Sequence, residues 1–68
     1  SDPHQRGSVE SLSVLEGELE VEVAGIVEIA RTGDTLRYRS DRPHIIRNRG
    51  KKPAQAIMVN ILKAAVME

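Results

Sequence analysis

The sequence contains no cysteine, which excludes disulfides, thiolate metal ligands and cysteine-based catalysis. It also lacks phenylalanine and tryptophan, and Tyr38 is its one aromatic residue. Stacking surfaces for single-stranded nucleic acid depend on aromatic rings, so such a surface is not expected. No apolar run approaches the roughly 20 residues of a membrane-spanning helix, and no signal peptide is visible. These absences favour a domain in a reducing cytoplasm, away from the membrane.

The chain is short and electrically balanced, with 68 residues and a formal net charge of zero. We therefore expect one small domain over residues 1–68 that does not bind nucleic acid directly. Because the sequence begins at Ser1 without a methionine, we expect it to be a fragment of a longer or processed chain.

The balanced charge conceals a polarity along the chain. Residues 1–30 are mainly acidic and residues 31–52 are mainly basic. One interpretation is that acidic and basic strands lie side by side and pair across a sheet. The alternative is electrostatic self-association between two copies of the chain.

Alternation of apolar and polar residues dominates the sequence and is typical of half-buried strands. It predicts short strands near residues 11–15, 18–23, 26–30, 35–39, 44–48 and 54–62, followed by a short tail that is helical or frayed. Glu16-Gly17 predicts a hairpin turn that pairs the first two strands. Short strands at this spacing indicate a small antiparallel β-barrel or sandwich.

Strand parity places several polar residues on the same side as the apolar core. Glu10 shares a side with Leu12 and Val14, and His44 shares one with Ile46 and Asn48. Polar groups that point into a small apolar barrel are costly unless they are paired or bind a cation.

The chain has two histidines, and His4 precedes Glu10 by a short segment that contains Gly7. Two imidazoles and a carboxylate suit zinc, iron, manganese, nickel or copper. Other interpretations stay open: His4 is exposed near a terminus, His44 caps a turn, Glu10 pairs with an arginine, and Asn48 is a hydrogen-bonding residue at a strand end.

The pattern of these residues resembles the two sequence motifs of the cupin family. Six residues separate Glu10 from the hairpin glycine Gly17, and three residues separate His44 from Asn48. The first motif is carried by His4, Gly7, Glu10 and Gly17, and the second by Gly33, Asp34, Pro43, His44 and Asn48. The resemblance implies an all-β cupin fold, a jelly-roll-like double-stranded β-helix, whose first strands are missing from this sequence.

Within that family, the sequence resembles more closely the C-terminal cupin domain of bacterial XRE-type helix-turn-helix regulators. It implies a sensor that binds a small-molecule effector, forms a homodimer and leaves DNA binding to a domain outside this chain. His4, Glu10 and His44 would hold a divalent zinc, nickel, iron or manganese ion. Asp2 stands where the fuller motif has a further histidine. The ligand pocket would be lined by Tyr38, Ile46, Asn48 and Met58.

Two further functions follow from other features of the sequence. The His4, Glu10 and His44 set also resembles the site of metal-dependent cupin enzymes of the dioxygenase or isomerase class. The chain offers no other evident acid or base, so the sensor is the favoured interpretation. A purely structural dimerisation domain is suggested by residues 57–62, which are apolar on both faces of the predicted last strand.

Overall fold

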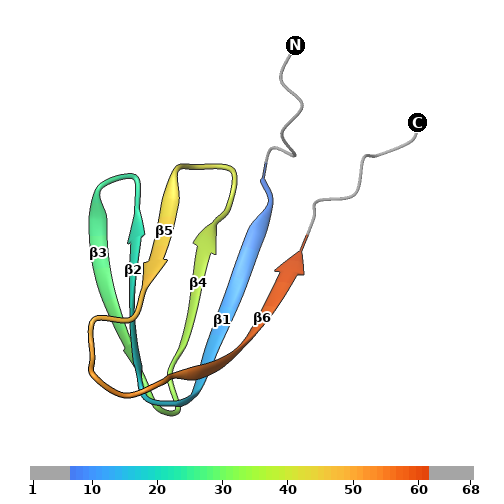
Figure 1. The fold of residues 1–68 in the computed structure, drawn as a ribbon. Coiled ribbons are helices and arrows are strands. Elements are labelled where there is room, and N and C mark those ends of the chain that lie inside the picture. The colour runs from blue at the N-terminus through green and yellow to red at the C-terminus, as the bar shows by residue number, and fades with distance from the viewer. Residues whose placement is uncertain (1–6, 62–68) are drawn as a thin grey trace, which may run out of the picture.

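The computed structural model describes residues 7–61, which form six strands and no helix (Figure 1). No helix in this described part is long and apolar enough to cross a membrane. The strands are β1 (Val9–Glu16), β2 (Glu18–Val23), β3 (Ile26–Arg31), β4 (Thr35–Arg39), β5 (His44–Arg47) and β6 (Gln55–Ile61). Their positions confirm the alternation seen in the sequence, except that β5 ends before Asn48.

Two antiparallel three-stranded sheets face each other, one in the order β4-β1-β6 and the other in the order β3-β2-β5. This arrangement confirms the predicted all-β fold. The sheets do not close into a barrel within residues 7–61, because all four outer strands, β4, β6, β3 and β5, have a neighbour on one side alone. The described residues therefore form an open sandwich.

The predicted hairpin between β1 and β2 is wrong. β1 pairs with β4 and β6, whereas β2 pairs with β3 and β5, so the two strands belong to different sheets. Gly17 lies at the corner between them, with a φ of +93° and Ala54 close by. A glycine followed by alternating residues is compatible with either a hairpin or a corner, and the sequence did not distinguish the two.

The true hairpin joins β2 to β3 through Ala24 and Gly25. Val23 pairs with Ile26, which leaves two residues in the loop. Both have positive φ, 49° at Ala24 and 83° at Gly25. Two positive φ values are what a type I′ turn requires, and its twist matches that of the flanking strands.

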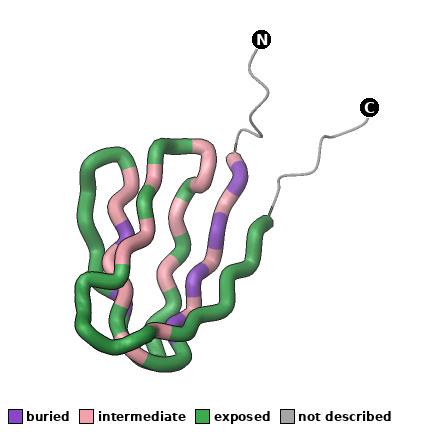
Figure 2. The backbone as a smooth tube through the Cα atoms, in the orientation of Figure 1, coloured by how far each residue is buried: buried purple, intermediate pink, exposed green. Residues whose placement is uncertain are grey.

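The core lies between the sheets and consists of alternate residues of β1 with one residue each of β2 and β3 (Figure 2). Leu12, Val14, Val21 and Ala30 are all at most 2% exposed. Glu10, on the same face of β1, is 8% exposed, which confirms its predicted inward direction. A carboxylate at this depth needs polar partners or a cation.

β6 is exposed along its whole length, unlike its neighbour β1 (Figure 2). Its large apolar side chains Ile57, Met58, Val59 and Ile61 are between 42% and 52% exposed. Its second edge has no strand partner among residues 7–61. An exposed apolar edge strand is a ready template for pairing with another strand.

Candidate metal and ligand site

The strand registers bring three polar side chains to the end of the sandwich where β1 begins. Glu10 of β1 lies opposite Tyr38 of β4, and His44 at the start of β5 lies opposite Val23. The two sheets face each other, so His44 approaches Glu10 and Tyr38 from the other layer. Glu10, Tyr38 and His44 are named the polar cluster below.

Tyr38 holds the Glu10 carboxylate directly. The Tyr38 hydroxyl donates a hydrogen bond of 2.5 Å to Glu10 Oε1. Burial, and then the hydrogen bond to Glu10, raise the pKa of the Tyr38 phenol well above its usual value of 10.0. The phenol therefore stays protonated and remains a donor to Glu10 at every physiological pH.

The His44 ring is oriented by its other nitrogen. Nδ1 lies 2.8 Å from the Arg42 carbonyl oxygen. A carbonyl only accepts, so we assign the proton to Nδ1. Nε2 is then directed at Glu10, with 3.7 Å between Nε2 and Oε1. The Tyr38 and His44 rings lie with centroids 5.5 Å apart, tilted by 50°.

Part of the predicted metal site fits this geometry. Metal-binding histidines commonly donate a hydrogen bond from the second ring N–H to a backbone carbonyl, as His44 does to Arg42. Two ligands about 2.1 Å from a tetrahedral metal are themselves about 3.4 Å apart, close to the 3.7 Å between His44 and Glu10. No group of three histidine, cysteine, aspartate or glutamate side chains converges within residues 7–61. His4 and Asp2, the remaining candidates, lie outside the described residues.

At the same end of the sandwich, Asp41 links the segment before β1 to the end of β4. Its carboxylate accepts the Gly7 backbone N–H at 2.9 Å and the Arg39 guanidinium at 2.7 Å. Nearby, the Ser40 N–H donates to the Ser8 carbonyl at 2.9 Å. The hydrogen bond from Arg39 and the one from Gly7 lower the pKa of Asp41 from 3.8 to about 2. These contacts hold the entry of β1 beside the turn that leads to His44.

Asp41→Asn is expected to remove part of the acid sensitivity of folding. A carboxyl whose pKa is lower in the folded state stabilises the fold fully above its ordinary pKa and loses that contribution as the pH falls. For Asp41 the loss falls between about pH 4 and pH 2, given 3.8 as its usual pKa and about 2 in the fold. Urea unfolding at pH 5, 3 and 2 measures this difference.

The control for Asp41→Asn is Glu28→Gln, which removes an exposed carboxylate with no partner in the described part of the chain. Asp41→Asn should lower stability at pH 5 and flatten the acid dependence, whereas Glu28→Gln should do neither. An unchanged slope in Asp41→Asn would show that the Gly7 and Arg39 contacts do not form in solution.

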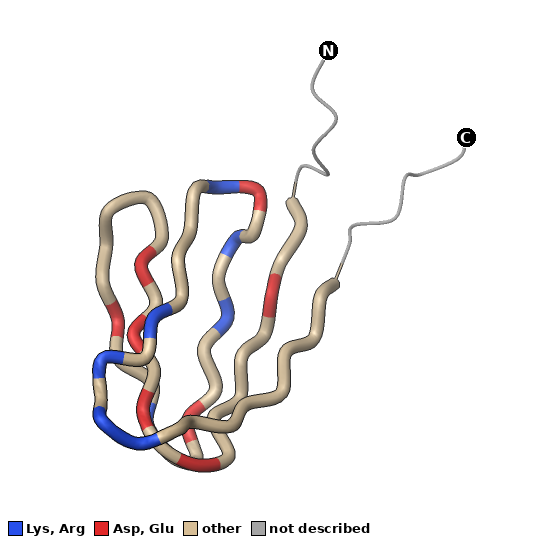
Figure 3. Tube along the Cα trace, in the orientation of Figure 1, with Lys and Arg blue, Asp and Glu red and all other residues tan. Residues whose placement is uncertain are grey.

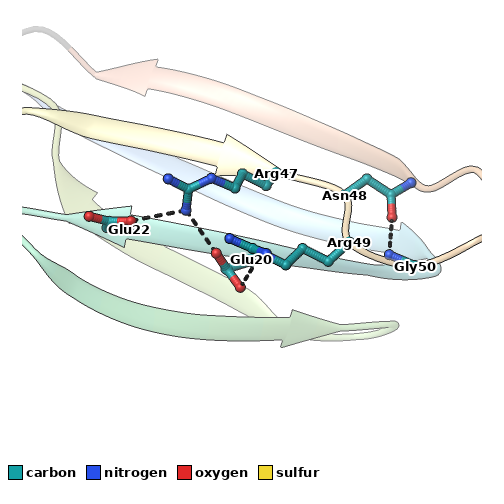
Figure 4. A network of polar contacts seen from close by, with 6 residues as sticks. All are labelled: Glu20, Glu22, Arg47, Asn48, Arg49 and Gly50. Atoms are coloured by element: carbon teal, nitrogen blue, oxygen red, sulfur yellow. Dashed lines mark hydrogen bonds and ion pairs between the residues drawn. The ribbon is translucent and has the colours of Figure 1, made fainter.

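The outer face of the β3-β2-β5 sheet carries a network of ion pairs (Figure 4). Figure 3 marks the positions of the charged residues along the backbone. Arg47 donates to Glu20 at 2.8 Å and to Glu22 at 2.9 Å, and Arg49 lies 3.0 Å from Glu20. Burial raises the pKa of Glu20, but the hydrogen bonds from Arg47 and Arg49 outweigh it and leave the pKa below its usual value. These pairs confirm the predicted cross-strand matching of acidic and basic residues.

The residues predicted to line the ligand pocket are spread through the fold. Tyr38 belongs to the polar cluster, and Ile46, half-buried, lies opposite Val21. Met58 lies opposite Leu12 and is 42% exposed. Asn48 is at the other end of the sandwich, where its side chain donates to the Lys52 carbonyl and accepts from the Gly50 N–H, both at 2.9 Å. The structure therefore joins Tyr38, but not Asn48, to Glu10 and His44.

Sequence reasoning missed two features of this arrangement. The first is the direct bond between Tyr38 and Glu10, which the parity of β1 and β4 could have indicated had their register been known. The second is a cavity of about 520 Å³ at the end of the sandwich that contains Asn48. Its sequence signal was the pair Lys51 and Lys52 after an Asn-x-Gly turn, which alternation along strands does not detect.

Comparison with known proteins identifies the class. The family described as Cupin domain matches residues 1–60, and the chain therefore belongs to the cupin family. Among curated proteins, the HTH-type transcriptional regulator SutR of Escherichia coli (strain K12) is 35% identical over 52 residues. The match covers 76% of this chain and 29% of that regulator. No solved structure matched the chain.

These findings confirm the resemblance on which the fold was predicted. The chain is a cupin domain similar to a segment of a helix-turn-helix regulator. The chain spans under a third of that relative, 29% of its length. The activity of the whole relative is therefore not attributed to this chain. Fold membership also leaves function open, because one fold serves many chemistries.

Proposed function

We propose that this chain is the sensor domain of a bacterial transcription regulator and binds a metal ion or small-molecule effector at the polar cluster. The observation that supports it is the convergence of Glu10, Tyr38 and His44 at one end of the space between the two sheets. A few convergent polar groups beside apolar side chains are typical of ligand sites. The similarity to the regulator SutR favours a sensor over an enzyme.

A divalent ion, zinc, nickel, iron or manganese, would be held by Glu10 Oε1 and His44 Nε2, with His4 as the third ligand. When bound, the metal would supply a Lewis-acidic centre with open positions for an effector oxygen or nitrogen. Tyr38 would fix the carboxylate through its hydrogen bond, and the Arg42 carbonyl would fix the imidazole. Gly7, the first of the described residues, is anchored by Asp41 at this end.

The proposed regulator would read DNA through a helix-turn-helix domain of the XRE type, outside this chain, and would act in the cytoplasm. Effector binding at the polar cluster would change the arrangement of β1, β4 and β5, the strands that carry its residues. Within residues 7–61 there is no helix that could enter a major groove. Direct DNA contact is therefore assigned to the other domain.

Native mass spectrometry of the freshly purified protein, paired with elemental analysis, tests the sensor proposal. We expect the chain to retain a divalent metal, a small molecule or both, with any metal released by a chelator. His44→Gln should abolish retention, because it removes the imidazole that meets Glu10. Its matched control, Gln55→Ala, changes an exposed polar residue at the opposite end of β6. A chain that retains nothing and binds no divalent metal on titration would overturn the proposal.

We further propose that the regulator is a homodimer in which β6 contributes to the interface. Exposed Ile57, Val59 and Ile61 share one face of a strand that has no charged residue. A second copy would cover these side chains and the open edge of β6. Burial at an interface is a common way for a small domain to gain stability.

Light scattering at micromolar concentration tests the dimer. The wild-type chain should have the mass of a dimer, and Val59→Glu should reduce it to a monomer by placing a charge in the interface. The matched control is Val27→Glu on β3, because Val27 is 50% exposed and Val59 is 51% exposed. A wild-type monomer, or equal dissociation by both variants, would count against an interface at β6.

A further inference from the structure

A second candidate site lies at the end of the sandwich opposite the polar cluster. Three connections meet there: the corner between β1 and β2, the turn between β3 and β4, and the loop from β5 to β6 (Figure 1). A cavity of about 520 Å³ opens between them. Its lining includes Gly17, Arg31, Thr32, Asn48, Lys51 and Lys52. Small-molecule sites have volumes of about 300–1,000 Å³, so the size is suitable.

The cavity is left positively charged by the way the ion pairs are distributed. Arg47 and Arg49 are neutralised by Glu20 and Glu22 on the outer face of the sheet (Figure 4). Lys51 and Lys52 follow directly in the same loop, and neither ammonium group has an acidic partner within residues 7–61. Figure 3 shows the basic residues of this loop in blue, separated by short uncharged segments.

Only one acidic side chain, Glu18, is present in the lining of this cavity as described. Glu18 lies 3.9 Å from Arg31, and both side chains are more than half exposed, at 53% and 68%. A solvent-exposed pair at this distance is weak and readily exchanges for another partner. The lining as a whole therefore carries two unpaired lysines and an arginine that is loosely paired.

The loop that carries the lysines is ordered by its own hydrogen bonds. Asn48 closes it by donating to the Lys52 carbonyl and accepting from the Gly50 N–H, at 2.9 Å each. Across the cavity, the Thr32 hydroxyl accepts from the Gly17 N–H at 3.0 Å and donates to the Gly17 carbonyl at 3.2 Å. Fixed backbone around the cations reduces the entropy that a ligand must overcome.

We propose that this cavity binds the oxyanion group of a small molecule, a carboxylate or a phosphoryl group, through Lys51, Lys52 and Arg31. Charge-assisted bonds from such groups are the strong class of polar contact. The cations line a hollow and not an extended ridge, which favours a compact ligand over a nucleic acid. This inference goes beyond the sensor proposal, because it uses neither Glu10 nor His44 and requires no metal.

The test is an NMR titration of the ¹⁵N-labelled chain, with inorganic phosphate in one arm and succinate in the other. Chloride is adjusted to keep ionic strength constant, and the protein is first passed over a chelating resin so that metal at the polar cluster does not contribute. We expect saturable shifts at Thr32, Gly50 and Lys51. Tighter binding of phosphate would assign a phosphoryl ligand, and tighter binding of succinate would assign a carboxylate.

Two double variants separate a built site from diffuse charge attraction. Lys51→Gln with Lys52→Gln should weaken binding by about tenfold or more, the loss expected for one or two charge-assisted contacts. Arg37→Gln with Arg42→Gln removes the same charge from exposed positions away from the cavity and should leave affinity unchanged. Absence of saturable shifts, shifts centred elsewhere, or equal weakening in both variants would overturn the proposal.

Discussion

Gly17→Ala is expected to lower the free energy of unfolding by about 2–4 kcal/mol, combining left-handed strain with overpacking. Gly17 has a φ of +93°, in the region that residues with a Cβ atom rarely adopt. An added Cβ would also lie 3.0 Å from both Cα and Cβ of Ala54 and 3.2 Å from the Pro53 carbonyl oxygen. Urea unfolding followed by circular dichroism measures the effect.

Gly25→Ala provides the matched control for Gly17→Ala. Its φ is +83°, but an added Cβ would meet nothing within 4 Å. The strain alone should cost about 1–2 kcal/mol, and the difference between the variants reports the contact with Ala54. Equal losses would mean that the corner at Gly17 does not approach the β5–β6 loop, and that the two sheets are joined differently.

Glu10→Gln is expected to weaken divalent metal binding by about 100-fold or more, since loss of a ligand exceeds the 10–100-fold effect of an outer partner. The substitution keeps the shape of the side chain but removes the negative charge that would meet the cation. The measurement is isothermal titration calorimetry with zinc and with manganese. Glu28→Gln, an exposed residue of β3, removes the same charge and should not change the affinity.

Tyr38→Phe should weaken the same binding by about tenfold, the lower end of the effect of an outer partner. It removes the hydroxyl that holds Glu10 Oε1 and leaves the ring in place beside His44. If neither Glu10→Gln nor Tyr38→Phe changed the affinity for metal, the polar cluster would not be the metal site.

Parity along strands predicted the inner face of this fold well. The buried positions of Leu12, Val14 and Glu10 follow from alternation within one strand, which is a local property. The approach of His44 to Glu10 was also predictable, because the two cupin motifs that carry these residues are expected to line one site. Local alternation therefore carried most of the information about the polar cluster.

Pairing between strands was harder to predict, because it depends on contacts between distant parts of the chain. Alternation in β1 and β2 is the same whether these strands pair with each other or with other strands, so it predicts a hairpin at Gly17 where the chain in fact turns a corner. Asn48 was placed on the inward side by counting from His44, but β5 ends at Arg47 and the count no longer applies in the loop. Arg47, the last residue of β5, and Arg49, in the loop that follows, both form ion pairs with Glu20 where the strand ends.

The ¹⁵N spectrum of the His44 imidazole during titration with zinc tests whether His44 and Glu10 share one metal site. With Nδ1 bound to the Arg42 carbonyl and Nε2 directed at Glu10, zinc should coordinate Nε2 and leave Nδ1 protonated. The Nε2 resonance should therefore shift on binding in the wild-type chain and stay unchanged in Glu10→Gln at the same zinc concentration. Coordination through Nδ1, or the same Nε2 shift in Glu10→Gln, would contradict a shared site for His44 and Glu10.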